Sequence, residues 1–349
     1  MLSFGIFDHV DDNGSPRGEQ FEERIKLVEL LEAEGLYGYH LAEHHATPLG
    51  TVPCPSVFLA ALAQRTRRIR FGPLVYVLPL HHPLRLYEEI CMLDHMSGGR
   101  LMLGVGRGGA LLEHARYGIE AAIAPATAQA MYHECFDVLM RACATDVLDF
   151  DGKFYRFKDF VITAKPLQRP HPPIWYGAPN PEAIGWAAPR SVNVVSLGPA
   201  ARARDISIRY RKEWGELRRK GEDLPMIGIT RHIVVAETDA AAQRIAREAY
   251  LPWREAIGFL WERSKVDFVL AGIYPKTFEE LQAIGHGIAG SPATVRDYLK
   301  DLERETGINY LLGQMVFGTM KFSDAARSLQ LFAREVMPAF KRQFAGQRV

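Results

Sequence analysis

The chain has 349 residues, of which 48% are hydrophobic and 24% charged, with a formal net charge of +1. This length is enough for one large α/β domain, and the near-neutral charge gives no basic surface for nucleic acid or an anionic membrane. No apolar run approaches the roughly 18 residues needed to span a bilayer. The cysteines have neither metal-binding nor redox spacing, so we predict a cytoplasmic protein without a metal site.

Short β-rich runs alternate with amphipathic helical stretches along nearly the whole chain. In the first predicted helix, apolar residues recur at helical spacing until Gly35 supplies a C-terminal stop. Strands are predicted at 2–7, 37–43, 69–77, 101–106, 173–178, 192–197, 227–235 and 308–316. Helices are predicted at 19–34, 55–66, 84–96, 127–144, 181–189, 200–220, 239–262, 292–306 and 323–343.

A βα alternation repeated about eight times implies parallel strands joined by helical crossovers. Over this length it favours a closed (β/α)8 TIM barrel, so we predict a single domain spanning 1–349. Two stretches interrupt the pattern. Residues 147–162 place Asp151-Gly152 between apolar runs, which predicts a hairpin. The aromatic-rich connection 239–290, after the seventh strand, is either a lid over the site or extra helix packed on the barrel wall.

The second predicted strand runs into Glu43-His44-His45, at the end of a barrel strand where catalytic residues usually lie. Successive strand residues face opposite sides, so two adjacent histidines do not point into one pocket. This spacing disfavours a metal cluster, and the pair His81-His82 has the same handicap. A single imidazole acting as acid or base fits better. The alternative is a histidine that is hydrogen-bonded for structural reasons only.

The fourth predicted strand ends in a glycine-rich turn, Gly104 to Gly109, that matches the dinucleotide pattern G-x-G-x-x-G. That fingerprint normally opens a domain, whereas three βα units precede this one. A turn where the backbone approaches a ligand fits better, with Arg107 offering its guanidinium to a phosphate. The alternative is that the glycines only turn the chain and that Arg107 lies in solvent.

The fifth predicted strand stops at Gly177, where Asn180 is suited to cap a helix with Pro181 at its first position. The unpaired N–H groups and the dipole at a helix start favour an anion. Strands four and five are neighbours in a barrel, so this turn and Arg107 are expected to face the same phosphate.

Together, five stretches resemble the bacterial luciferase-like flavin-dependent monooxygenases. The stretches are Glu43–His45, Gly72–Pro83, Leu93–Arg100, Gly104–Gly108 and Gly177–Glu182. The resemblance implies a barrel that binds FMN across the C-terminal ends of its strands. It also implies that a separate NAD(P)H-dependent reductase supplies reduced FMN, which reacts with O2 to give a C4a-hydroperoxide that oxygenates an organic substrate. The aromatic residues of 239–290 suggest that this substrate is small and apolar. A homodimer is expected as well.

The resemblance assigns roles residue by residue. His44 matches the catalytic histidine near the reactive edge of the flavin, and Leu74-Val75 matches a non-prolyl cis dipeptide behind the isoalloxazine. Arg107 matches a phosphate-binding arginine. The backbone segment expected to cradle the same phosphate is Gly177, Ala178, Pro179 and Asn180.

The sequence departs from luciferases at two of these positions. Pro179 lacks an N–H that could bind the phosphate, and Gly106 replaces a thiol, so oxygenation of another molecule is expected instead of light emission. Some relatives use a deazaflavin and transfer hydride, although their motif more often has Asp where this chain has Glu43. Others are non-catalytic flavin-binding subunits, an alternative against which His44 argues.

Overall fold

The computed structural model describes residues 2–119, 124–217 and 221–340. The predicted helix ends at 218–220 and 341–343 lie outside the described residues, and the single-domain prediction for 1–349 stays a prediction. Within the described ranges, no helix combines the length and apolar character that crossing a membrane requires. The cytoplasmic location stays a prediction too.

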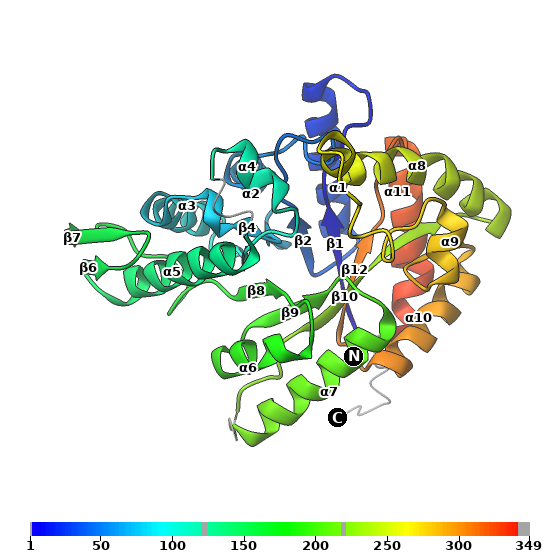
Figure 1. The fold of residues 1–349 in the computed structure, drawn as a ribbon. Helices are drawn as coiled ribbons and strands as arrows, with labels where there is room; N and C mark the ends of the chain where they lie inside the picture. The colour runs from blue at the N-terminus through cyan, green and yellow to red at the C-terminus, as the bar shows by residue number, and fades with distance from the viewer. Residues whose placement is uncertain (1, 120–123, 218–220, 341–349) are drawn as a thin grey trace.

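All eight predicted strands are present, and they pair in parallel around a nearly closed barrel (Figure 1). Their order is β3-β2-β1-β12-β10-β9-β8-β5-β4. The bounds are β1 Ser3–Asp8, β2 Gly38–Leu41, β3 Arg70–Pro73, β4 Tyr76–Val77, β5 Leu103–Gly106, β8 Ile174–Gly177, β9 Asn193–Ser196, β10 Ile227–Val235 and β12 Tyr310–Gln314. β3 and β4 are two halves of one predicted strand, so the two ends of this order meet. An isolated bridge between Phe71 and Leu101 also joins that seam.

Helices surround the strands on the outside of the barrel (Figure 1). The long helices lie at the predicted positions: α1 Arg17–Ala33, α2 Pro55–Arg65, α3 Pro83–Met96, α5 Pro125–Ala144, α7 Ala200–Glu216, α8 Asp239–Arg263, α10 Pro292–Thr306 and α11 Phe322–Leu331. The predicted helix 181–189 is instead a 3-10 turn at Pro181–Ala183, α6 at Ile184–Ala187 and another 3-10 turn at Ala188–Arg190. Three elements were not predicted: α4 Leu112–Arg116, α9 Phe278–Ala283 and β11 Gly287–Gly290.

Local signals explain where the well-predicted helices begin and end. Thr238 caps α8 by accepting a hydrogen bond from the N–H of Ala241, and Ser291 caps α10 in the same way. α10 ends at Gly307, whose φ of 64° is the left-handed conformation that glycine adopts most easily. These caps satisfy helix-end groups that would otherwise lack partners.

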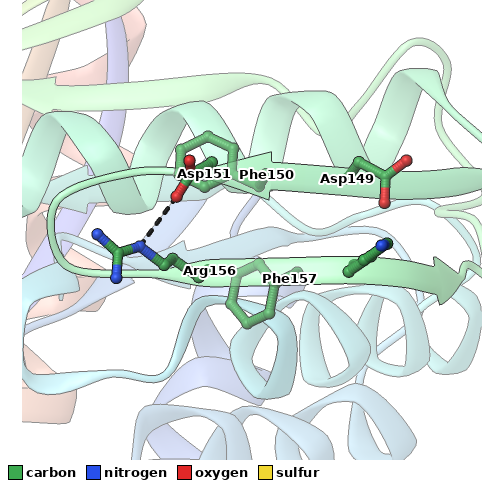
Figure 2. A pocket seen from close by; sticks show the side chains of 6 residues that line it. Asp149, Phe150, Asp151, Arg156 and Phe157 are labelled. Carbon is green, nitrogen blue, oxygen red and sulfur yellow. Dashed lines mark hydrogen bonds and ion pairs between the residues drawn. The ribbon is translucent and has the colours of Figure 1, made fainter.

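Residues 147–162 form the predicted hairpin, β6 Val147–Asp151 and β7 Arg156–Val161. The turn closes with a 2.9 Å hydrogen bond from the N–H of Gly152 to the carbonyl of Tyr155. Figure 1 shows the hairpin projecting away from the barrel. The hairpin carries a pocket of about 550 Å³. Figure 2 shows the side chains that line it, including the exposed ion pair of Arg156 and Asp151. This pocket is lined only by hairpin residues, so it is not formed by the strand ends.

The connection 239–290 folds as α8, α9 and β11, and β11 pairs with the C-terminal half of β10. Its aromatic residues Tyr250, Trp253 and Phe278 are buried, as expected for helices packed on the barrel wall. Trp253 also contacts His9 at the end of β1, with ring centroids 5.7 Å apart. The segment therefore packs against the wall and also reaches the segments that follow the strands at several points: Thr47 donates to the carbonyl of Ala256, and Ala110 packs with Leu260 and Trp261.

Candidate functional site

Alternate strand residues face the barrel axis, and they fill the barrel below its C-terminal end. One buried cluster comprises Phe7, Ala42, Leu74, Met102, Trp175, Val195, Tyr310 and Leu312. His9 and His44 follow two residues after Phe7 and Ala42, so they continue the inward-facing rows toward the C-terminal end. Their rings stack there, with centroids 5.5 Å apart and an interplanar angle of 23°. We call His9 and His44 the inner histidine pair.

His44 is held by a residue that the sequence analysis missed. Its Nδ1 lies 2.7 Å from Oε1 of Glu113, a buried side chain on α4. Burial alone would lower the pKa of His44, but the charge and hydrogen bond of Glu113, together with the charge of Glu43, raise it above its ordinary value. The only sequence signal for α4 was the unusual delay between the fourth strand and the next predicted helix.

His9 has the opposite electrostatic setting. Burial lowers its pKa well below the ordinary value, and the charges of His44, His232 and Arg24 lower it further. Its ring also packs against Phe7 and Trp253 at centroid distances of 4.8 Å and 5.7 Å. His9 was not predicted as a site residue, although it follows the first predicted strand, where catalytic side chains of a barrel often lie.

The other face of β2 carries a second set of contacts, made by what we call the outer cluster: Glu43, His45, His81 and Tyr117. Nε2 of His45 and of His81 lie 2.8 Å and 2.9 Å from Glu43, and the N–H of Val77 donates to the same carboxylate. The hydroxyl of Tyr117 lies 2.9 Å from Nδ1 of His45. His44 and His45 thus point to different sides, as their spacing predicted, and Glu43 lies on the side of His45.

In the outer cluster, the pKa of one carboxylate is strongly shifted. Burial opposes ionisation of Glu43, but hydrogen bonds from His45, His81 and Val77 lower its pKa to about 2. In the described part of the chain, no group of three or more His, Cys, Asp or Glu residues is arranged to hold a metal ion. The hydrogen bonds of Glu43 tie the segment that follows β2 to Val77 in β4 and to His81, so this carboxylate anchors neighbouring strand ends.

The Leu74–Val75 peptide is cis, as the resemblance implied. It lies where β3 gives way to β4, facing β5. A Cβ on Gly106 would lie 2.6 Å from Cγ2 of Val75, and one on Gly104 would lie 1.9 Å from the carbonyl of Pro73. Position 106 therefore has no room for a thiol side chain unless Val75 moves.

Arg107 and the turn after β8 lie on neighbouring strands, because Leu103 and Gly104 pair with Ile174 and Trp175. Burial raises the pKa of Tyr176, and the nearby charge of Arg107 partly offsets that effect. Among the described residues, the Arg107 guanidinium has no hydrogen bond or ion pair. A Cβ on Gly177 would meet nothing within 4 Å, so there is open space at this turn.

The turn itself offers fewer donors than predicted. The N–H of Ala178 donates to the carbonyl of Val195 at 2.9 Å, and Pro179 has none. Asn180 caps the next turn as expected, with its Oδ1 accepting from the N–H of Ala183 at 3.2 Å. The helical segment that follows is short and irregular, so its dipole is weak. A phosphate placed here would depend mainly on Arg107.

A family model describing luciferase-like monooxygenases matches residues 2–310. The chain belongs to the luciferase-like monooxygenase family. It is 26% identical to the oxygenase component of a flavin-dependent trigonelline monooxygenase from Acinetobacter baylyi, and the match covers 99% of this chain and 98% of that protein. Recognition of the family from sequence is thereby confirmed.

Solved structures of family members share the whole fold. Monooxygenase RslO1 from Streptomyces bottropensis has a TM-score of 0.82 and 26% identity, covering 97% of this chain and 100% of that one. The oxygenating constituent of 3,6-diketocamphane monooxygenase from Pseudomonas putida, a type II Baeyer–Villiger enzyme in complex with FMN, has a TM-score of 0.77 and 21% identity, covering 97% and 98%. The luciferase-like barrel is therefore confirmed, while the roles of the individual site residues stay predictions.

Proposed function

We propose that the protein is the oxygenase component of a two-component, FMN-dependent monooxygenase that oxygenates a small, apolar organic substrate. The observation that carries the proposal is the C-terminal end of the barrel strands, where none of the described residues bonds Nε2 of His44 or the guanidinium of Arg107. The trigonelline relative, named as flavin-dependent and as an oxygenase component, supports both a flavin and a separate reductase. The 3,6-diketocamphane structure, which contains FMN, supports FMN as that flavin.

The residues present fit FMN. Arg107 would bind the phosphate beside the open space at Gly177, with Asn180 shaping the turn. Leu74 and Val75 would lie behind the isoalloxazine. When bound, reduced FMN supplies the electrons that activate O2, and His44 would hold or move a proton at Nε2. Trp253 is fully buried and packs against His9, so it would support the inner histidine pair from behind.

The decisive experiment starts from the cofactor. We expect the purified protein to bind reduced FMN more tightly than a deazaflavin, and to consume O2 only when reduced FMN is supplied. NADPH oxidation should stay negligible until an unrelated flavin reductase is added, since no second nucleotide site was found in the sequence. Brisk NADPH oxidation without that reductase would contradict the two-component mechanism.

The same assay separates the two alternatives. A hydride-transfer enzyme would prefer the deazaflavin and would not consume O2. A non-catalytic subunit would bind FMN without oxygenating any member of a panel of aldehydes, terpenoids and alkanes. Product carrying one atom from labelled O2 would exclude both.

We further propose that the protein is a homodimer that uses the outer face of α2 and α3. Val57 and Met92 are 73% and 63% exposed there. They border a cavity of about 550 Å³ that also contains Glu43 and His45 of the outer cluster. Exposed apolar patches of this kind often mark interfaces between protein chains. Light scattering on wild type and Met92→Lys tests the assignment, and a monomeric wild type would overturn it.

A further inference from the structure

We propose that Glu113 is a positioning residue, which makes Nε2 of His44 the nitrogen that gives and takes protons at the site and leaves the stacked His9 as its neutral partner. The catalytic consequence rests on the proposed function. The state of the two rings does not, because it is a property of the protein without flavin. The two claims are therefore tested separately.

The first step is the burial of Glu113. Its side chain is 3% exposed, and among the described residues His44 is its only ion-pair partner. A buried carboxylate without a compensating charge is strongly disfavoured. α4 places Oε1 of Glu113 2.7 Å from Nδ1 of His44. A protonated imidazole is therefore the counter-ion that the structure provides.

The second step is the tautomer of His44. An ionised carboxylate only accepts hydrogen bonds, so Nδ1 of His44 must donate to Glu113. In the neutral ring Nε2 then carries the lone pair, and in the cation it carries the exchangeable proton. No hydrogen bond from the described residues reaches Nε2, and the side chain is 22% exposed. The geometry therefore directs proton exchange to Nε2, much as a buried aspartate orients the histidine of a serine protease.

The third step is the contrast with His9. The charged and titratable groups near His44 are Glu113 on α4, which contacts its ring, Glu43, which precedes it in the chain and points to the other side, and His9, which follows β1. Those that face His9 are His44, His232 on β10 and Arg24 on α1.

One carboxylate thus contacts the His44 ring and a second acts on it from nearby, whereas cationic or imidazole groups act on His9. The pKa of His44 is raised and that of His9 is lowered. Two stacked imidazoles do not both ionise readily, so environments that push two titratable groups apart set which one is the acid.

The test follows the ring nitrogens of His44 and His9 by NMR in the full-length, flavin-free protein with labelled histidine. His44→Gln and His9→Gln identify the two signals. The variants are Glu113→Gln, which removes the charge, Glu113→Leu, which also removes the acceptor, and Glu113→Asp, which restores the charge. Glu248→Gln is the matched control, because it removes a carboxylate from an exposed ion pair on α8.

In wild type we expect His44 to keep Nδ1 protonated throughout its titration and to take its second proton at Nε2. Glu113→Gln should lower the proton affinity of His44 by about tenfold or more, Glu113→Leu should also randomise the tautomer, and Glu113→Asp should recover most of the affinity. The pH dependence of kcat should move with the NMR titration while KM for the substrate changes little.

Several outcomes would overturn the inference. One is an unchanged His44 titration in a folded Glu113→Gln protein; another is a wild-type His44 protonated first at Nε2. If Glu113→Gln and Glu113→Leu do not fold, the wild-type tautomer and the Glu113→Asp titration still decide it. If the NMR results hold but no substrate is oxygenated with reduced FMN, the proposed function fails and the positioning role stands.

Discussion

The two faces of β2 use the same kinds of side chain for opposite purposes. The inner histidine pair faces the barrel axis, where Glu113 satisfies one nitrogen of His44 and leaves the other free. In the outer cluster, both nitrogens of His45 are engaged, one by Glu43 and one by Tyr117. A histidine with every nitrogen satisfied stabilises structure, whereas one with an open nitrogen beside a ligand space can exchange protons. Adjacent positions 44 and 45 therefore form a natural pair for experiments.

The largest expected effect is a difference in turnover between the alanine variants of His44 and His45. Removing a general acid or base typically costs about 10²- to 10⁴-fold in rate, so His44→Ala should lose that much oxygenation while FMN affinity stays within a few-fold. His45→Ala should mainly lower stability, because it breaks buried hydrogen bonds without opening the site. Steady-state turnover with a supplied reductase, read beside thermal unfolding, makes the comparison. Equal turnover losses at a temperature where both variants are folded would contradict the division of roles.

The next effect concerns the anchor itself. Glu43 accepts from two histidines and one backbone N–H while almost fully buried. Glu43→Gln keeps the shape but loses the charge, and hydrogen bonds to charged groups contribute about 1.5–3 kcal/mol each. We expect the variant to be destabilised by on the order of 3 kcal/mol in denaturant unfolding at neutral pH. Glu89→Gln, on the nearby face of α3, is a control with a less buried carboxylate.

Glu43 also makes the stability of the folded protein depend on pH, in a direction that its pKa determines. The pKa of Glu43 is lowered from 4.5 to about 2 in the folded protein. Its contribution to stability is therefore fully present above pH 4.5 and is lost as the pH falls from there toward 2. Wild type should lose more stability over this window than Glu43→Gln, in which the group no longer titrates. Parallel acid-unfolding curves for the two proteins would show that Glu43 is not the anchor.

Much of this comparison could be predicted from sequence, because alternation along a strand is a local property. The spacing of Glu43, His44 and His45 already indicated that they face different sides. The contact between His44 and Glu113 could not be predicted in this way, because they are 69 positions apart and the chain between them passes through β3, β4 and β5. α4 has only five residues, too few for a helical period to be recognised.

The turn after β8 also combines a local feature that could be predicted with a long-range contact that could not. Asn180 was correctly identified as a cap, since capping is decided by neighbouring residues. That the N–H of Ala178 is used by Val195 depends on the pairing of β8 with β9, which sequence spacing does not reveal. The backbone cradle stays a prediction, and in this structure the N–H of Ala178 is already engaged by the carbonyl of Val195.

The smallest expected effect tests how much Arg107 contributes to binding the FMN phosphate. Arg107→Ala removes the one unpaired guanidinium identified at this turn, so it should weaken FMN by about ten- to a hundredfold, the equivalent of one to two charged hydrogen bonds. Riboflavin has the same ring without the phosphate, and it should bind weakly to both proteins and hardly respond to the substitution. Asn180→Ala should cost FMN less, because Asn180 shapes the turn through its cap with Ala183. Fluorescence titrations of both flavins at fixed ionic strength measure all of these affinities. Equal losses for FMN and riboflavin in Arg107→Ala would mean that Arg107 supports the turn and does not bind the phosphate, while His44 would keep its separate role.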